Sequence, residues 1–113
     1  MKFYVYITTN PNQDALYVGM TNNLEQRIIE HYLNRGKPDT HAGKYFCYNL
    51  IFYQSYQYVK EAIAREKEIK KWRREKKKTL ISAFNSEWKN LNAELFGHWP
   101  LSEELLFHRK DQI

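Results

Sequence analysis

A cation and a side chain able to transfer protons lie close together in one short stretch of this chain. Tyr17-Val18-Gly19 reads as the end of a strand that turns directly into a helix. The helix carries Arg27 and His31, which are four residues apart and therefore neighbours on one helix face. This arrangement is typical of a functional site built on rigid elements. The alternative is an ordinary strand-to-helix connection whose arginine and histidine are exposed to solvent.

A carboxylate interrupts the apolar side of a later helical pattern, over residues 59–72. The apolar stripe of that pattern consists of Val59, Ala62, Ile63 and Ile69. Glu66 lies within the stripe, where a carboxylate is costly unless it is paired, hydrogen-bonded or bound to a metal. Glu66 is therefore either a functional acid or the partner of a basic side chain at the core edge. The helix alone favours neither reading, since structural ion pairs also perturb acids.

Two strands are expected before the first helix. Residues 3–8 and 15–20 alternate in side-chain type, and a cluster of turn-forming residues separates them. We expect a hairpin in which Tyr6 lies opposite Tyr17 and Tyr4 lies opposite Gly19. Directly opposite residues share a face of the sheet, so the three tyrosines should gather on one side. The glycine leaves room there for a ring or a ligand.

The remaining elements follow from capping signals and periodicity. Asn22, with Glu25 three residues later, resembles a capping box and predicts a helix from about Asn23 to Leu33. After it we expect a polar loop at 36–43, a strand at 46–58, a helix at 59–72 and a further helix that stops near Asn85. Residues 102–108 form a short amphipathic piece that we expect to pack on the core or on a partner.

Composition favours a polyanionic partner. The 113 residues carry a formal net charge of +5, which most simply suggests nucleic acid. Basic residues form a dense run with few balancing acids, so a phosphate-binding surface is favoured over a merely solvated face. The run includes Lys70, Lys71, Arg73, Arg74 and Lys77.

The same sequence argues against a secreted or membrane protein. The single cysteine, Cys47, lies in an apolar run and resembles a small buried hydrophobe. No signal-peptide pattern and no apolar run of membrane-spanning length occurs. We therefore expect a soluble, cytoplasmic protein.

Taken together, the motifs resemble the GIY-YIG nuclease family. Tyr4-Val5-Tyr6 stands where the first signature is expected, and Tyr17-Val18-Gly19 stands where the second is expected. Arg27 and His31 fit the family's helix, Glu66 fits its metal-binding glutamate, and Asn85 fits the asparagine after the next helix. The resemblance covers roughly residues 3–90, and the combination is more specific than either tripeptide alone. The basic segment is similar to that of small stand-alone bacterial members.

This resemblance implies an α/β (α+β) domain with a small three-stranded antiparallel sheet flanked by helices. It implies hydrolysis of phosphodiester bonds in nucleic acid, with DNA the expected substrate and repair one expected setting. Glu66 would hold Mg²⁺ or Mn²⁺ through oxygen. Arg27 would neutralise charge on the phosphoryl group. Tyr6 would activate or align the attacking water. Tyr17 and His31 would position the water and the phosphate, and His31 would share the role of base. Asn85 would orient groups near the metal.

Three functional hypotheses and the domain limits stay open at this point. The first is an active endonuclease that prefers a nucleic-acid shape over a sequence. The second is a catalytically weak nucleic-acid-binding module of the same fold, favoured by Met20, which stands where repair-nuclease relatives often place a lysine. The third is a partner-binding protein with a solvated basic face. We expect the nuclease-like domain to span 1–90 and an extension to span 91–113, and the oligomeric state is open.

Overall fold

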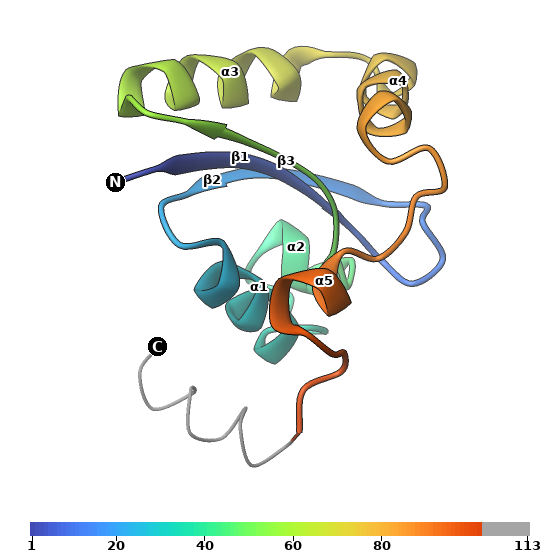
Figure 1. Ribbon diagram of the computed structural model, residues 1–113. Coiled ribbons are helices and arrows are strands. Elements are labelled where there is room, and N and C mark those ends of the chain that lie inside the picture. Colours follow the sequence, from blue (N-terminus) through green and yellow to red (C-terminus); the bar gives the residue numbers. More distant parts are fainter. Residues whose placement is uncertain (103–113) are drawn as a thin grey trace.

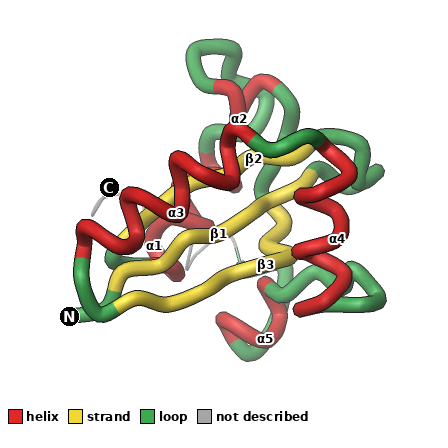
Figure 2. The backbone as a smooth tube through the Cα atoms, turned by 90° about the horizontal axis from the view of Figure 1, so that it is seen from above, coloured by secondary structure: helices red, strands yellow, loops and turns green. Residues whose placement is uncertain are grey.

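The computed structural model describes residues 1–102, which form a three-stranded antiparallel sheet with helices on both faces (Figure 1). The strands are β1 (Phe3–Thr9), β2 (Leu16–Thr21) and β3 (Asn49–Tyr56), in the spatial order β2-β1-β3 (Figure 2). The sequence prediction of an α+β domain with this small sheet is confirmed. The helices are α1 (Leu24–Leu33), α2 (His41–Lys44), α3 (Val59–Lys71), α4 (Arg74–Phe84) and α5 (Asn92–Phe96).

The β1–β2 hairpin has a different register from the expected one. Tyr6 pairs with Gly19 and Tyr4 with Thr21, so the pairing is shifted by two residues. The cause is the connecting loop, in which the Asn10 side chain accepts hydrogen bonds from the backbone N–H groups of Asp14 and Ala15 at 2.9 and 3.0 Å. This loop delays the start of β2. Because a shift of two preserves the face, Tyr4, Tyr6 and Tyr17 still share one side of the sheet.

The two faces of the sheet are covered by different helices. In Figure 1, α3 and α4 lie above the sheet, while α1, α2 and α5 lie below it. The upper face buries an aliphatic cluster that includes Val5, Ile7, Val18, Ala62 and Ile69. The lower face buries Tyr6, Leu24, Ile28, Leu50 and Leu91. Alternation along β1 therefore sends its valine and isoleucine to one helix layer and its tyrosines to the other.

The segment between α1 and β3 contains a helix that the sequence prediction missed. Residues 36–43 were expected to be a loop, yet α2 begins at His41, where the Thr40 side chain accepts a hydrogen bond from Gly43 N at 3.0 Å. Cys47 is buried, as expected, and its backbone N–H bonds to Ala42 O at 2.9 Å. This turn occupies residues expected to be extended, so β3 begins only at Asn49.

Helices α3 and α4 agree closely with the expected elements, whereas α5 was not predicted. Helix α3 covers 59–71 of the expected 59–72, and α4 ends with Asn85 as its C-cap. On α3, Ala62 and Ile69 are buried, but Val59 and Ile63 are exposed, so the buried stripe is narrower than predicted.

After α4 the chain crosses to the lower face of the sheet. Leu91 joins the lower cluster, and buried Asn92 bonds to Leu50 N and to Tyr48 O, both at 3.0 Å. Leu101 is also buried, against Ile29. The domain limits at residue 90 stay a prediction, and most of the expected amphipathic piece at 102–108 lies outside the described residues. Within residues 1–102, no helix is long and apolar enough to cross a membrane.

Candidate functional site

The candidate site starts from the fit of Tyr6 over Gly19. A Cβ atom added at Gly19 would collide with the phenol end of Tyr6 and lie 2.9 Å from Tyr17 Cε2. Glycine is therefore needed here to give the Tyr6 ring room to pass over β2, the edge strand of the sheet. The ring reaches from β1 across β2 in this way. Its hydroxyl arrives where α1 passes beneath the sheet.

The hydroxyl of Tyr6 lies 2.8 Å from His31 Nε2 on α1. Tyr6 is only 1% exposed, and burial raises the pKa of its phenol, with a smaller contribution from Tyr17 in the same direction. Burial, together with the nearby charge of Arg27, lowers the pKa of His31 to about 4. At neutral pH both groups are therefore uncharged, and the pair can share a proton without either carrying a net charge.

Tyr17 and then His41 extend the Tyr6–His31 pair toward the protein surface. The Tyr17 ring centroid lies 5.2 Å from that of His31 and 6.3 Å from that of His41, the latter in a stacked arrangement. A depression of about 170 Å³ opens beside these rings. It is lined by Tyr17, Arg27, Glu30, His31, Asn34, Thr40, His41 and Ala42.

His41 is the site residue that the sequence interpretation missed. It was assigned to a polar loop, 10 residues after His31, with no periodic pattern to connect it to Tyr17. The available signal was Thr40, a good helix N-cap residue, directly before it. Helix α2 places His41 against Tyr17 only because the chain turns back after α1, a packing event that local sequence does not encode.

Arg27 lies on the rim of the depression and keeps freedom to move. Its side chain is 41% exposed, and its closest carboxylate is Glu30, at 3.8 Å on the same helix. An ion pair of this length on the surface is weak. A phosphate in the depression could therefore displace Glu30 as the partner of the guanidinium.

Glu66 approaches from the opposite face of the sheet. Its side chain is 22% exposed on the side of α3 that carries Ala62 and Ile69, and its carboxylate pairs with Lys70 at 3.5 Å. Lys70 is thus a basic partner of the kind that the sequence analysis gave as the alternative explanation for Glu66. The charge of Glu66 also makes a small contribution to the raised pKa of Tyr6, so it lies within electrostatic range of the Tyr6 hydroxyl.

One carboxylate of this kind can take part in binding Mg²⁺ or Mn²⁺, since Mg²⁺ usually keeps several waters and binds through one or two carboxylates and substrate phosphates. No three His, Cys, Asp or Glu side chains gather into a metal cage anywhere in residues 1–102. Glu66 therefore fits a metal ion whose other ligands are water and phosphate oxygens. It does not fit a metal ion whose ligands all come from the protein.

Asn85 is not brought into this group. Its side-chain amide donates to Ile51 O at 3.1 Å and to Lys89 O at 2.9 Å, and its Oδ1 accepts from Lys89 N at 3.0 Å. Ile51 belongs to β3, which is separated from β2 by β1. The structure thus gives Asn85 a role in joining the end of α4 to the sheet. Its catalytic role stays a prediction.

The predicted basic surface lies on α3, α4 and the turn between them. Within the described chain, Lys71, Arg73 and Lys77 have no carboxylate within 4 Å, whereas Lys70 pairs with Glu66. Arg74 donates to Asp14 O at 2.7 Å and so supports the hairpin loop. Trp72 lies among these cations, with Lys76 Nζ 4.4 Å and Arg65 Cζ 5.0 Å from a Trp72 ring centroid.

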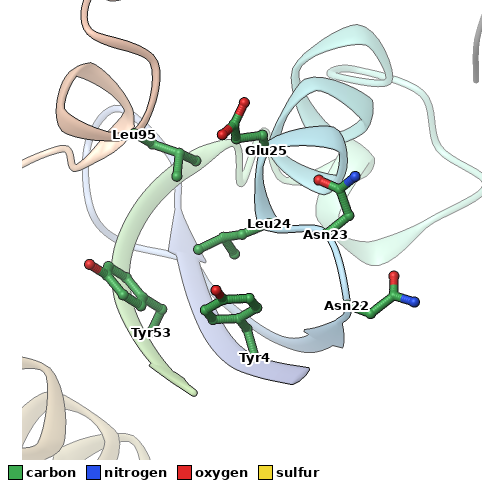
Figure 3. Close-up of a pocket in the computed structure, with 7 residues that line it drawn as sticks. All are labelled: Tyr4, Asn22, Asn23, Leu24, Glu25, Tyr53 and Leu95. Carbon is green, nitrogen blue, oxygen red and sulfur yellow. The ribbon is translucent and has the colours of Figure 1, made fainter. Parts of the chain in front are cut away.

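A second hollow lies near the N-terminal end of α1 (Figure 3). Tyr4, Tyr53, Leu24 and Leu95 surround it, and its volume is about 310 Å³. Tyr4 and Tyr53 meet edge to face at 6.3 Å. The reacting side chains named above are absent from its lining, so we assign the candidate site to the smaller depression beside Tyr17 and His31.

Comparison with known proteins identifies the family. The family model described as the GIY-YIG catalytic domain matches residues 2–79. The chain belongs to the GIY-YIG family. That match includes Tyr6, Tyr17, Arg27, His31 and Glu66.

Individual relatives agree with this GIY-YIG assignment. The chain is 35% identical to a UPF0213 protein of Clostridium perfringens over 92 residues, which cover 81% of this chain and 96% of the relative. It is 35% identical over 81 residues to a UPF0213 protein of Staphylococcus saprophyticus, covering 72% and 95% of the two chains. A solution NMR structure of a UPF0213 protein from Bacillus halodurans superposes with a TM-score of 0.52 at 27% identity, covering 82% of this chain and 96% of that one.

Proposed function

We propose that this protein is a divalent-metal-dependent endonuclease that hydrolyses phosphodiester bonds, with DNA as its substrate and nucleic-acid shape as the basis of its preference. Membership of the GIY-YIG family supports a nuclease. The observation that carries the proposal is the 2.8 Å hydrogen bond between buried Tyr6 and His31, beside a depression that Arg27 borders. The net charge of +5 suits a polyanionic substrate.

Tyr6 and His31 would act as one proton-accepting unit. If the Tyr6 hydroxyl donates to His31 Nε2, its oxygen keeps lone pairs that can accept a proton from the attacking water. The phenol proton would then pass to His31, so the phenol never becomes a free phenolate. This relay avoids the phenolate that the raised pKa of Tyr6 disfavours. It forms an imidazolium on His31, which the lowered pKa of His31 opposes, so the negative charge of a bound phosphate would have to stabilise it.

Arg27 and Tyr17 would handle the phosphate. The guanidinium can offer parallel N–H donors to two phosphoryl oxygens, and charge on those oxygens grows as the bond to the leaving group breaks. Tyr17 stands between His31 and His41 and would position the phosphate relative to the proton relay. His41 lines the same depression and can donate a hydrogen bond to a phosphate oxygen.

Glu66 would hold the divalent ion, which when bound supplies positive charge to the phosphate and to the leaving oxygen. Glu66 lies on α3, which packs against β2, the edge strand that also carries Tyr17. Lys70 currently shares the carboxylate of Glu66. Because Lys70 is half exposed, it can turn away to solvent when an ion takes its place.

A catalytically weak nucleic-acid-binding module is the alternative. Met20 packs against the aliphatic cluster on the α3 face, so this position contributes neither a cation nor any other group to the depression. A binding module would keep the basic surface of Lys71 and Arg73 and lose turnover. A measurement of nucleic-acid affinity therefore does not distinguish the binding module from the endonuclease, whereas a measurement of cleavage does.

The deciding experiment is a cleavage assay on end-labelled branched, single-stranded and duplex DNA with Mg²⁺, Mn²⁺ or chelator. We expect metal-dependent products from wild type. Tyr6→Phe keeps the ring over Gly19 and removes the hydroxyl, so it should bind DNA normally and cleave far more slowly. Tyr58→Phe, on an exposed tyrosine elsewhere, is the matched control. Binding without cleavage on every substrate would establish the module instead.

A further inference from the structure

A row of aromatic rings runs from the candidate site to the protein surface. His31 meets Tyr17 at 5.2 Å between centroids, Tyr17 meets His41 at 6.3 Å, and His41 meets Tyr45 at 4.8 Å. Tyr45 ends the row and is 44% exposed. Each ring restricts the next one, so the Tyr45 ring is presented in a defined place close to the depression that Arg27 and His31 line.

The backbone around Tyr45 is firmly fixed. Gly36 N donates to Gly43 O at 2.8 Å, and a Cβ atom at Gly43 would lie 2.6 Å from Lys37 O. Helix α2 is thus packed against the segment that precedes it as closely as a glycine allows. Tyr45 N donates to His41 O at 3.1 Å and closes the helix. The ring is therefore exposed on a rigid support rather than on a loose loop.

The next residue, Phe46, is also exposed in a costly conformation. It is 47% exposed and its φ is 59°, a left-handed value that bulky residues rarely adopt. Strain of this kind persists only where the surrounding structure enforces it, and it gathers at functional sites. Two adjacent exposed aromatic residues beside a candidate active site are therefore unlike apolar residues scattered singly over a surface.

The charge around Tyr45 suits a nucleic acid. Lys44 Nζ lies 5.4 Å from the Tyr45 ring centroid. No carboxylate in residues 1–102 lies within 4 Å of this ammonium group. Lys37 is exposed in the same segment. An exposed ring beside an unpaired ammonium group is the combination that proteins use for single strands, with a base on the ring and its phosphate near the cation.

We propose that Tyr45 and Lys44 bind an unpaired nucleotide next to the bond to be cleaved. The base stacks on the Tyr45 ring, and a flanking phosphate lies near Lys44. Within a duplex, neighbouring base pairs cover both faces of each base, so an internal paired base cannot stack in this way. This inference rests on the proposed function and specifies its substrate class, which is nucleic acid with a single-stranded segment at the cleavage site.

The test is a binding titration without divalent metal, comparing a short single-stranded DNA with a blunt duplex of the same sequence. Tyr45→Ala should weaken single-strand binding about 5- to 140-fold, the usual range for losing one base–aromatic stack, and leave duplex binding unchanged. Tyr45→Phe should bind both forms like wild type, since it keeps the ring. Tyr58→Ala, at a 62% exposed tyrosine, is the matched control and should change neither.

Two results would overturn the inference. Equal weakening on both DNA forms would mean that Tyr45 only supports His41, and no weakening on either would mean that the ring is not a contact. Lys44→Gln should weaken both forms and reduce the salt dependence by about one phosphate contact. Because no cleavage is measured, an inactive protein would end the proposed function without deciding this result. Selective loss of single-strand binding would support the inference in either case.

Discussion

The two faces of the sheet differ in chemistry as well as in the helices that cover them. The α1 face holds hydrogen-bonded and stacked rings, among them Tyr6, His31 and Tyr17, with two strongly shifted pKa values. The α3 face holds an aliphatic cluster, and its helices carry lysines and arginines outward. One face thus has the groups that can move protons, whereas the other has the charge that can attract a polyanion.

This division predicts that binding and chemistry can be altered separately in this domain. Residues of the basic surface on α3 and α4 should affect affinity and its salt dependence, as should Lys44 and Tyr45 at the end of α2. Tyr6, Arg27 and His31 on the α1 side should affect turnover. Glu66 is the exception, because it comes from α3 and yet contributes to the raised pKa of Tyr6 on the other face. The predictions below either strengthen or break this comparison.

The largest effect should come from Glu66→Gln, which keeps the size of the side chain and removes its charge. We expect cleavage to be abolished, because a hard divalent ion loses its carboxylate ligand. Stability should change by no more than about 1 kcal/mol, since the partner Lys70 is 49% exposed and such pairs are weak. Melting curves should rise with millimolar Mg²⁺ or Mn²⁺ in wild type only.

Glu68→Gln is the matched control for that prediction. Glu68 belongs to the same helix and pairs with Arg65 at 2.6 Å, but it is more exposed and lies off the buried side. It should keep both cleavage and the metal-induced rise in melting temperature. A wild type whose melting temperature ignores metal would contradict the assignment of Glu66.

Arg27→Ala should give the next largest effect, on turnover. If Arg27 acts on the transition state as an oxyanion donor does, the rate at saturation should fall on the order of a hundredfold, with little change in affinity. Arg73→Ala, an exposed arginine next to α4, should show the opposite pattern. Single-turnover cleavage and a binding titration measure the two quantities. Poor binding with a normal rate for Arg27→Ala would break the division between the faces.

Acid should destabilise the α1 face through His31. Its pKa is lowered from 6.5 to about 4 in the folded state, so the unfolded chain binds the extra proton between these values. Stability from this group is therefore complete above about pH 6.5 and is lost as pH falls toward 4, by at most about 3 kcal/mol.

Urea unfolding of wild type and His31→Gln across this pH range measures that loss. Carboxylates titrate in the same window, so the difference between the two proteins is the informative quantity. The wild type should lose its stability relative to His31→Gln as the pH falls. A constant difference across the range would mean that His31 is not held neutral by burial.

The smallest effect should come from the basic surface. Replacing Lys71, Arg73 and Lys77 together by Gln should weaken DNA binding to the same degree for every sequence and flatten the slope of affinity against salt. Each of these surface changes should cost within about 0.5 kcal/mol of stability. Arg74 is left in place because it supports the hairpin loop. An unchanged salt slope would place DNA binding elsewhere.

The local patterns of the sequence determined most of the longer elements and the faces that their side chains occupy. Alternation put Tyr4, Tyr6 and Tyr17 on one side, and that prediction survived an error of two residues in the register because side chains in strands repeat every two residues. Helical spacing likewise placed Arg27 beside His31 and Glu66 on the buried side of α3. These properties depend on neighbours within a few positions along the chain.

Contacts between distant segments were decided only by the tertiary structure. The Asn10 loop set the register that puts Tyr6 over Gly19, and the return of the chain through α2 brought His41 to Tyr17. Packing directed Asn85 to β3, although its position in the sequence suggested the site. Periodicity tells which way a side chain faces, but a partner 25 residues away, as for Tyr6 and His31, depends on how the layers close on one another.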